Sequence, residues 1–442
     1  MKKIKILQLT DAFYPTVDGT VNAVSNYAKE LNKITECKVA APNFSKKSKY
    51  VESLDFEIFR CRNSIFSAEK YRLADPNSDL KFSRNIKEQK FDIFHAHTPF
   101  ALGAFAVKTG KKQNIPVVAT LHTKYYDDIY RIVKNNAVTL FILHMLMEVY
   151  KKADFVWTVS DMAKNILRQY GYKGEVDVVR NGTEFVYPEN DKELVDRVNA
   201  LHNLEGQENV FLFVGRMAMY KNLKLICDAL KILKDSGEKF KMFFVGGGFD
   251  LKELKEYIKK LKIDDVCVTT GEVKDRQLLQ GYYLRADLLL FPSVFDTSGV
   301  VKVEAAAHKL ASVLIKNTCS AEQVEDNVNG FLCEENAEDY ANCLKNLCKN
   351  PQKMKEVGEK AYQTLYRSWE MVAQEVYEKY QRAIEIYNRK KEIKRRTLAI
   401  DKLKKKIKAE KKAEIKKEKQ TAKKLNNVKK QKEKKKKNKK HP

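Results

Sequence analysis

Short apolar runs alternate with longer helical patterns along most of this 442-residue chain. Many of the runs end in Gly, Asn, Pro or a polar turn, which is typical of parallel strands connected by helices. The pattern therefore predicts an α/β fold. The predicted strands cover residues 4–9, 91–94, 116–121, 155–159 and 176–179, and then 210–214, 241–245, 266–269, 288–291 and 312–315.

The strand pattern stops over a polar interval from Pro188 to Asn209 and then restarts. The chain is also longer than the roughly 250–300 residues that a single hydrophobic core supports. We therefore expect two doubly wound domains. The predicted boundaries are 1–181 for the N-terminal domain, 182–208 for a linker, 209–368 for the C-terminal domain, 369–388 for a closing helix and 389–442 for a basic tail.

The net charge of +26 is concentrated in the tail. Residues 389–442 contain 27 Lys and Arg against 6 Asp and Glu, a balance of +21, which leaves +5 for residues 1–388. Each cation near an anionic leaflet contributes about 1 kcal/mol before screening, so we expect the tail to bind an anionic membrane surface. A solvated tail and non-specific attraction to RNA are the alternatives. Lysines without interleaved aromatics do not favour base reading, so no specific nucleic acid is expected.

Within the tail, Ile393, Ile400 and Ile407 lie seven residues apart with Leu403 between them. This spacing predicts one narrow apolar stripe on an otherwise cationic helix. Beyond Ala413 the stripe thins, and disorder is expected there.

The cysteines and the apolar segments indicate a protein of the reducing cytosol. Eight cysteines are scattered without CxxC pairs or Cys/His clusters, so neither a disulfide framework nor a zinc site is expected. The N-terminal apolar run is too short for a signal peptide and resembles a first strand. The longest apolar stretch, Ala137–Met147, is shorter than the roughly 18 residues of a membrane span. Any membrane association is therefore expected to be peripheral.

Polar and glycine residues follow several predicted strands. Arg216 and Lys221 come just beyond the strand at 210–214, where an Arg fork and a Lys point charge suit a diphosphate. Gly19 precedes a helical pattern at the end of the first strand, where helix N-terminal amides favour anions. His122 directly follows another strand, which favours a site role. A solvated cation pair and a simple tight turn are the alternatives for Arg216, Lys221 and Gly19.

The segment from Asp296 to Glu304 holds the densest set of candidate residues. Asp296 lies in a predicted loop and Glu304 in the second turn of the next helix, so both can line one pocket. Between them, Thr297 to Val300 offer backbone amides at a helix N-terminus, which suits a pyrophosphate. Without context, two such acids are more often a helix cap and a surface charge.

Two further motifs do not favour a cofactor. Gly246-Gly247-Gly248 follows a predicted strand, but Leu251 stands where a dinucleotide fingerprint has its third glycine, so an NAD- or FAD-dependent enzyme is not favoured. His95-Ala96-His97 has no third ligand at motif spacing, and we interpret it as a structural turn instead of a metal site.

These segments, in this order, resemble the GT4 family of retaining glycosyltransferases. The resemblance rests on the FYP…G turn, HAHTPF, the strand-ending His122, ADFVWTVS, NGT, VGRxxxxKN and the Asp296…Glu304 block, and it spans roughly residues 1–385. Within the family, HTKYYDD and FDTSGVVKVEAAAHK are most similar to the bacterial diacylglycerol glucosyltransferases. The resemblance implies a GT-B fold, in which two Rossmann-like domains face a cleft and bind the acceptor and the sugar nucleotide respectively.

The resemblance also implies a role for each candidate residue. Arg216 and Lys221 match the phosphate-binding pair, and His122, Asp296 and Glu304 match residues at the donor sugar and ribose and form the expected catalytic set. The expected donor-binding set is Gly19, Arg216, Lys221, Gly246, Val273, Thr297, Ser298, Gly299, Val300 and Glu304. The expected acceptor and membrane contacts are Lys124, Tyr125 and Tyr126.

By the same resemblance, the expected reaction moves glucose from UDP-glucose to 1,2-diacylglycerol with retention, giving an α-glycosyl diacylglycerol. The leaving phosphate would accept the proton of the attacking hydroxyl, with no metal and no tightly bound cofactor. The expected location is cytoplasmic, peripheral on the inner face of the cell membrane. A soluble or polyprenyl-linked glycan is the alternative acceptor, and an RNA-binding protein acting through its tail is the alternative of another class.

Two residues depart from the family pattern. Asp296 stands where Glu is commoner, which shortens the side chain by one methylene and leaves the identity of the donor sugar open. Lys309 stands where most members have glycine, although the diacylglycerol branch is similar to this chain at that position.

Overall fold

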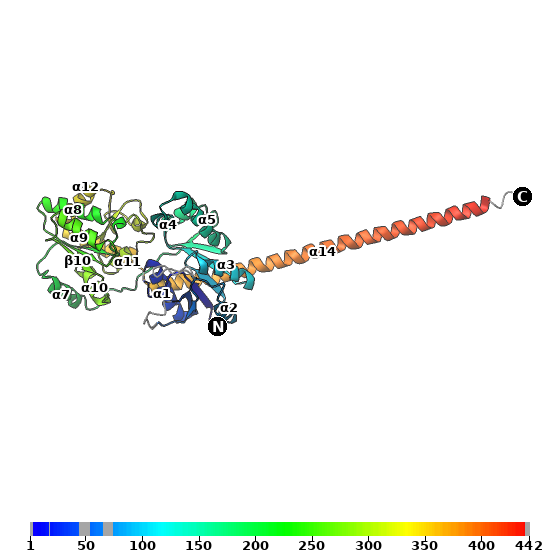
Figure 1. Ribbon diagram of the computed structural model, residues 1–442, viewed down its shortest axis with the longest axis horizontal. Coiled ribbons are helices and arrows are strands. Elements are labelled where there is room, and N and C mark those ends of the chain that lie inside the picture. Colours follow the sequence, from blue (N-terminus) through cyan, green and yellow to red (C-terminus); the bar gives the residue numbers. More distant parts are fainter. Residues whose placement is uncertain (1–2, 17, 44–53, 65–73, 438–442) are drawn as a thin grey trace. The chain divides into compact units, whose positions relative to one another are not determined.

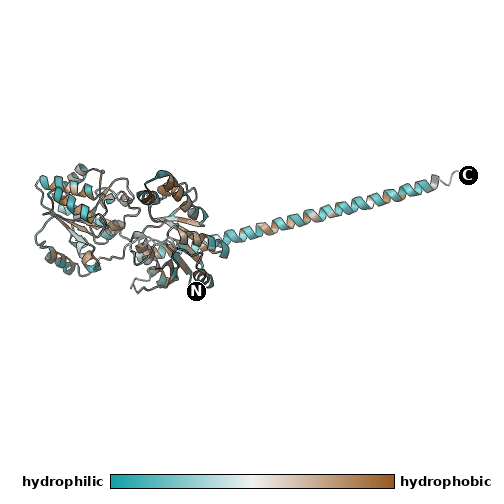
Figure 2. Ribbon diagram, in the orientation of Figure 1, coloured by the Kyte–Doolittle hydropathy of each residue, from teal (hydrophilic) through white to brown (hydrophobic). Residues whose placement is uncertain are grey.

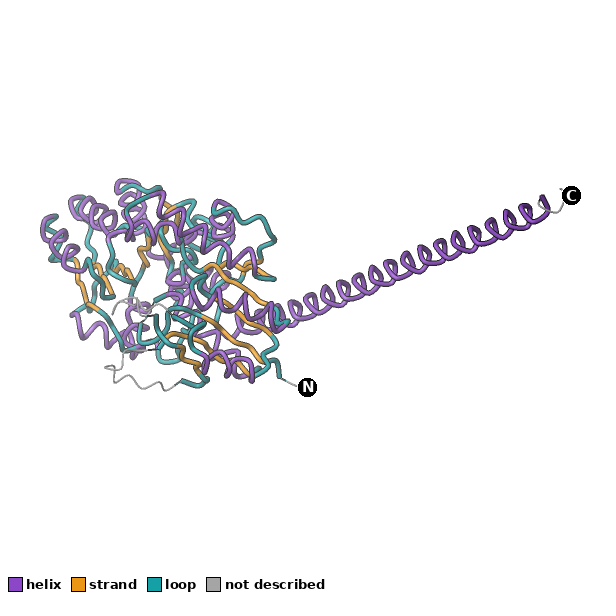
Figure 3. The backbone as a smooth tube through the Cα atoms, turned by 45° about the vertical axis from the view of Figure 1, so that its right-hand side comes forward, coloured by secondary structure: helices purple, strands orange, loops and turns teal. Residues whose placement is uncertain are grey.

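The computed structural model describes residues 3–16, 18–43, 54–64 and 74–437 (Figure 1). The chain separates into two compact units, Met1–Gln381 and Arg382–Pro442. The first unit contains two parallel sheets, whose strands lie among the surrounding helices (Figure 3).

The N-terminal sheet has seven parallel strands in the order β3-β2-β1-β4-β5-β6-β7. Its strands are β1 (Lys5–Leu9), β2 (Glu36–Pro42), β3 (Ile58–Cys61), β4 (Ile93–Ala96), β5 (Val117–Leu121), β6 (Phe155–Thr158) and β7 (Asp177–Val178). The helices between them are α1 (Gly19–Ile34), α2 (Leu80–Glu88), α3 (Ala101–Gln113), α4 (Tyr125–Val133), α5 (Asn136–Lys152) and α6 (Asp161–Gln169). The order reverses between β1 and β4, and open α/β sheets bind ligands outside the carboxyl ends at such a point.

The C-terminal sheet has six parallel strands in the order β10-β9-β8-β11-β12-β13, with its reversal between β8 and β11. Its strands are β8 (Val210–Val214), β9 (Lys241–Val245), β10 (Cys267–Gly271), β11 (Leu288–Phe291), β12 (Ser312–Ile315) and β13 (Phe331–Cys333). Its helices are α7 (Asp191–His202), η1 (Met219–Lys221), α8 (Leu223–Asp235), α9 (Leu251–Lys260), α10 (Arg276–Arg285), α11 (Val300–Ala307), η2 (Cys319–Ala321), α12 (Ala337–Cys348) and α13 (Pro351–Leu365).

The sequence of each element explains its place in these layers. Every residue of β5 and of β8 is buried, as expected for parallel strands covered by helices on both faces. Side-chain caps start the helices at the sheet edge: Asp18 accepts the amide of Val21 at α1, and Ser160 accepts the amide of Ala163 at α6. These caps fix the loops from which the candidate site is built.

The α/β prediction is confirmed, and all ten predicted strands are present to within two residues. Three strands were not predicted, namely β2, β3 and β13. The boundaries between the two domains, the linker and the closing helix stay predictions.

After the C-terminal sheet the chain returns to the N-terminal one. The amide of Thr183 donates to the carbonyl of Arg367 at 2.8 Å, and the amide of Trp369 donates to the carbonyl of Thr183 at 3.1 Å. Helix α14 (Trp369–Lys437) begins here, and its Tyr380 ring stacks on Trp157 with ring centres 5.5 Å apart. The start of α14 is thereby part of the N-terminal core.

In the second unit, α14 continues as a helix to Lys437, so the expected disorder beyond Ala413 is wrong. No glycine or proline occurs between residues 359 and 441, and the abundant Lys, Ala, Glu and Gln are strong helix formers. The residues of this unit are mostly hydrophilic with scattered apolar positions (Figure 2). The predicted stripe of Ile393, Ile400, Leu403 and Ile407 lies on this helix, and each of these side chains is about half exposed. Among the described residues, no helix combines the length and the apolar character that a membrane span requires.

Candidate active site

A cavity of about 380 Å³ lies at the carboxyl ends of β8, β9 and β10. Two of its lining residues must be glycine for the loops to pack closely. A Cβ on Gly246 would lie 2.0 Å from the carbonyl oxygen of Gly215. A Cβ on Gly248 would likewise lie 2.2 Å from the carbonyl oxygen of Met217. The glycine run therefore serves close approach of two backbones. The lining residues are Val214, Gly215, Arg216, Val245, Gly246, Gly247, Gly248, Glu272, Val273 and Leu279.

Lys221, in the segment after β8, and Asp296, in the loop after β11, are in direct contact. The Lys221 ammonium lies 3.0 and 3.1 Å from the two carboxylate oxygens of Asp296, and Ser293 donates its hydroxyl to the same carboxylate. Asn222 ties the loops together by donating to the Pro292 carbonyl at 3.1 Å. The structure therefore brings together the cation expected at the phosphate and the acid expected at the sugar, which lie 75 residues apart.

The loop from Thr297 to Val300 forms the start of α11. Gly299 has φ +56, and a Cβ there would lie 2.9 Å from the Cα of Ser320, so glycine is the residue that fits. Thr297 donates its hydroxyl to the His122 carbonyl, and Asn181 donates to the Ser298 hydroxyl at 3.2 Å. The side chains of Thr297 and Ser298 thus contact the N-terminal domain, which the sequence did not predict.

Glu304 lies on α11 and accepts a 2.6 Å hydrogen bond from the Tyr283 hydroxyl. Burial raises the pKa of the Glu304 carboxyl, and the Tyr283 hydrogen bond opposes that rise. A half-buried carboxylate with one defined donor is a positioned acceptor and not a surface charge.

His122 follows β5, and its ring is buried. Its Nε2 lies 2.8 Å from Nδ1 of His97, and the two rings stack with centres 5.1 Å apart. Burial lowers the pKa of His122 to about 4, so the ring is neutral at pH 7. His95 and His97 are both fully buried and hydrogen-bonded. Among the described residues, no group of three or more His, Cys, Asp or Glu is arranged to hold a metal ion.

The three residues expected at the acceptor all lie at the start of α4, and one of them contacts the C-terminal domain. Lys124 donates to the Val294 carbonyl of the C-terminal domain at 2.7 Å, and Tyr125 is buried against Phe100. Tyr126 donates its hydroxyl to Asn136 at 2.8 Å. Lys124, which is partly buried, therefore bridges the two domains.

Gly19 begins α1, and a Cβ built on it would meet no atom within 4 Å. Sterics within the protein therefore do not require glycine there. Open space next to a helix N-terminus is compatible with close approach of a phosphate.

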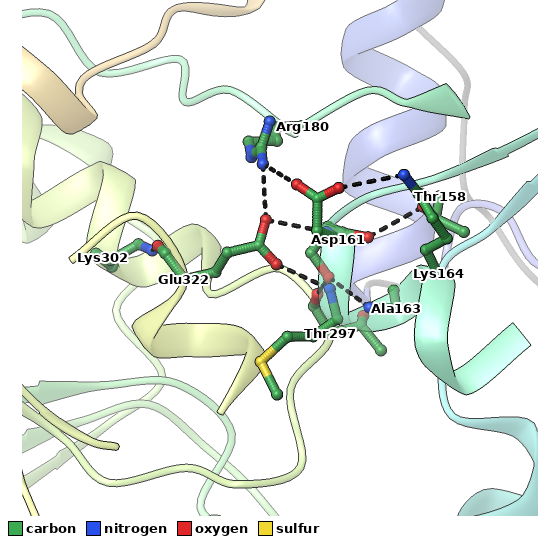
Figure 4. Close-up of polar contacts among 10 residues, drawn as sticks. Thr158, Asp161, Ala163, Lys164, Arg180, Thr297, Lys302 and Glu322 are labelled. Atoms are coloured by element: carbon green, nitrogen blue, oxygen red, sulfur yellow. Dashed lines mark hydrogen bonds and ion pairs between the residues drawn. The ribbon is translucent and has the colours of Figure 1, made fainter. Parts of the chain in front are cut away.

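A polar cluster that the sequence did not predict joins the two domains (Figure 4). The Glu322 carboxylate accepts the amides of Asp161 and Met162 at 2.9 and 3.0 Å, at the N-terminus of α6. Arg180 donates to Glu322 at 2.8 Å and to Asp161 at 2.5 Å. We call Asp161, Met162, Arg180 and Glu322 the interdomain clasp. A helix N-terminus and a guanidinium both favour this carboxylate.

Lys302 attaches the clasp to α11. Its buried ammonium donates to the backbone carbonyl of Glu322, and burial lowers the pKa of Lys302 to about 8. Ser160, the cap of α6, donates to the Thr297 carbonyl at 2.7 Å. The helix that carries Glu304 is therefore linked to the N-terminal domain through Glu322 and through the loop that precedes it. The only local signal was a serine followed by an acid at a helix start, which identifies a cap but not its partner.

Comparison with known proteins covers almost the whole first unit. Residues 17–185 match Glycosyltransferase Family 4, and residues 196–364 match Glycosyl transferases group 1. An alpha-monoglucosyldiacylglycerol synthase of Streptococcus pneumoniae is 25% identical over 333 residues, covering 74% of this chain and 75% of the relative. Its counterpart in Acholeplasma laidlawii is 24% identical over 355 residues, covering 78% and 88% respectively.

Solved structures share the fold at low identity. The Anabaena protein HepE, in complex with UDP and glucose, has a TM-score of 0.68 at 19% identity and covers 86% of this chain and 99% of its own. WaaG, a glycosyltransferase involved in lipopolysaccharide biosynthesis, has a TM-score of 0.62 at 16% identity, with 84% and 98% covered. With both family matches in chain order and two parallel sheets, the chain belongs to the GT4-type glycosyltransferases of the GT-B fold.

Proposed function

We propose that this enzyme transfers glucose from UDP-glucose to 1,2-diacylglycerol with retention, as a peripheral protein on the cytoplasmic face of the cell membrane. The names of the two bacterial relatives support the acceptor, and the UDP and glucose bound by the Anabaena protein support the donor. The domains are proposed to divide this work, with the acceptor at residues 1–181 and the sugar nucleotide at residues 209–368.

The proposal of a lipid acceptor rests on the exposed apolar side chains of α4 and α5. These helices pack against each other and follow β5 and His122 in the chain. Lys134, Lys151 and Lys152 lie on the same two helices or between them. Apolar side chains bordered by lysines suit the boundary between headgroups and acyl chains. The exposed side chains are Tyr130, Ile132, Val138, Leu140, Phe141 and Met145.

In the proposed donor complex, Arg216, Lys221 and the amides at Gly299 and Val300 stabilise the diphosphate. Charge develops there as the glycosidic bond breaks, and fixed donors aimed at such charge are a large part of catalysis. Glu304 would accept the ribose hydroxyls, with Gly246 and Val273 at the base and ribose. The leaving phosphate would take the proton from the acceptor hydroxyl, and Asp296 and His122 would contact the sugar.

Transfer of labelled sugar into vesicles tests this function. UDP-glucose, UDP-galactose and GDP-mannose are supplied with vesicles containing diacylglycerol, with polyprenyl phosphate sugars or with soluble glycans. We expect a single glucolipid from UDP-glucose and diacylglycerol, with an α-anomeric coupling by NMR. A product only on polyprenyl-linked or soluble glycans would contradict the lipid acceptor, and a β-product would contradict retention.

Glu304→Gln is expected to weaken UDP binding and turnover about 10- to 100-fold. The amide still accepts from Tyr283 but lacks the charge, and hydrogen bonds to charged groups contribute roughly 1.5–3 kcal/mol. Glu256→Gln is the matched control, because Glu256 is an exposed helix carboxylate whose side chain is 67% exposed. Titration calorimetry with UDP measures the effect, and equal affinities for the two variants would show that Glu304 does not contact the nucleotide.

Glu322→Ala is expected to lower kcat about tenfold or more while UDP affinity stays close to that of the wild type. The clasp holds the domains together through charge-assisted hydrogen bonds, whereas the donor residues are mainly C-terminal. Glu325→Ala is the control, since Glu325 is exposed and lies three residues further along the chain. Steady-state kinetics provide the measurement, and an unchanged kcat for Glu322→Ala would mean that the clasp does not assemble the site.

A further inference from the structure

Behind His122 lies a buried polar network that the donor site does not use. Its members are Gln8 on β1, His95 on β4, His97 after β4, Thr120 on β5 and Tyr380 on α14. All five side chains are at most 2% exposed. A polar group buried this deeply is costly unless it is hydrogen-bonded, so the pattern of donors and acceptors is constrained.

The Gln8 amide determines which atoms of the network donate and which accept. Its nitrogen donates to the Tyr380 hydroxyl at 3.1 Å, and its oxygen faces Nε2 of His97 within hydrogen-bond distance. An amide oxygen only accepts, so Nε2 of His97 must carry the proton. The Tyr380 hydroxyl in turn lies 2.5 Å from Nδ1 of His95, whose Nε2 lies 2.6 Å from the Thr120 hydroxyl.

The position of the proton on His97 determines the position of the proton on His122. Burial holds the pKa of His97 well below its usual range, so the ring is neutral and has a single proton. With that proton on Nε2, Nδ1 of His97 is an acceptor. The Nε2 of His122, 2.8 Å away, must then be the donor. His122 is neutral as well, so its Nδ1 carries a lone pair, and this atom has no hydrogen-bond partner among the described residues.

We propose that Gln8 and His97 are positioning residues that fix His122 as its Nε2–H tautomer, so that Nδ1 accepts a hydrogen bond from a hydroxyl of the donor sugar. The role of the sugar rests on the proposed function, whereas the tautomer does not. The stacked His97 ring also fixes the plane of His122. A residue that acts through an imidazole in this way selects its tautomer and orientation, as the aspartate does in serine proteases.

The tautomer is measured directly by two-bond ¹H–¹⁵N correlation on the full-length protein labelled at its seven histidines. Loss of signal in His122→Asn assigns His122. At pH 7 without any donor, we expect the wild-type His122 to be protonated at Nε2 and bare at Nδ1. Protonation at Nδ1 would overturn the proposal, and this measurement requires no variant of the network.

Gln8→Met tests whether Gln8 determines the tautomer of His122. Methionine has a similar shape, but its sulfur accepts only weakly from His97, so we expect His122 to become a mixture of tautomers. Thr120→Val is the matched control, because it removes a buried hydroxyl from the His95 branch and leaves the path from Gln8 to His122 intact. An unchanged tautomer in a folded Gln8→Met protein, or the same change in Thr120→Val, would overturn the role of Gln8.

Kinetics then test the contact with the sugar. In Gln8→Met we expect kcat to fall roughly 10- to 100-fold, the range seen when outer partners of functional histidines are lost at metal sites. UDP affinity should be unchanged, because neither Gln8 nor His97 lines the cavity at β8–β10. A mixed tautomer with a wild-type kcat would overturn the sugar contact. Absence of transfer from every donor in the wild type would instead contradict the proposed function, while the NMR result would still decide the tautomer.

Discussion

Lys221→Met is expected to lower kcat/KM at least 100-fold and to weaken UDP binding strongly. In the structure the Lys221 ammonium neutralises Asp296 from 3.0 Å, and its side chain is only 12% exposed. Removing it takes away a cation for the diphosphate and leaves a carboxylate that repels the same phosphates. Loss of a single fixed group that stabilises transition-state charge lowers turnover by about 10²–10³ elsewhere. Transfer kinetics and UDP calorimetry measure the two effects, and wild-type UDP affinity would contradict the assignment.

A second variant separates the two contributions. If Lys221 only neutralises Asp296, the Lys221→Met/Asp296→Asn double variant should recover UDP affinity. If Lys221 binds phosphate itself, the double variant should remain weak, as we expect. Lys224→Met is the matched control, because Lys224 pairs with Glu253 and both side chains are 52% exposed. Exposed ion pairs contribute about 0–1 kcal/mol, so this control should behave like the wild type.

The parts of the fold that the sequence predicted are those with a strong local signal. β8 reads VFLFV and is buried throughout, so a continuous apolar run marked it. β2 reads ECKVAAP, in which two alanines and a proline weaken the strand pattern although it pairs with β1 and β3. β13 has three residues and lies at the edge of its sheet. Such short strands are specified by their neighbours and not by their own composition.

The candidate site shows the same limit. Arg216 and Lys221 were identifiable because residues after parallel strands meet at one edge of the sheet. The contact between Glu322 and the start of α6 joins residues 160 positions apart and depends on how the two domains pack against each other. The hydrophobic periodicity of either segment does not predict this contact between domains. The prediction of a structural turn at His95-Ala96-His97 is wrong, because His95 and Ala96 lie on β4. Both histidine rings belong to a buried network completed by Gln8 and Tyr380.

The tail was mispredicted beyond Ala413 for a different reason. Low apolar content and high charge argue against a packed core, but they do not exclude an isolated helix of strong helix formers. Arg395 and Arg396 pair with Glu392 one turn away on this helix, which supports the helix locally. The same helix presents its lysines all round, so its charge is available to a partner surface.

Deleting residues 389–442 is expected to reduce binding to anionic vesicles more than 100-fold at low salt. The tail carries a net +21 against +5 for residues 1–388. Each lysine near an anionic leaflet contributes up to about 1 kcal/mol, and every 1.4 kcal/mol is a factor of about ten, so a few effective contacts suffice. Activity on diacylglycerol dispersed in neutral detergent should be unchanged, because the proposed site lies wholly within the first unit.

The salt series decides between the two membrane contacts. Attraction between exposed charges is screened over about 8 Å at physiological ionic strength, so binding through the tail should fall as salt rises and as anionic lipid is diluted. Binding through the apolar surface of α4 and α5 should persist at high salt. Phe141→Ser, which changes a side chain that is 63% exposed, should weaken this salt-resistant binding. Co-sedimentation of full-length protein, residues 1–388 and Phe141→Ser with vesicles measures each contribution. Equal binding by the first two forms at every salt concentration would contradict the role of the tail and assign the membrane contact to α4 and α5.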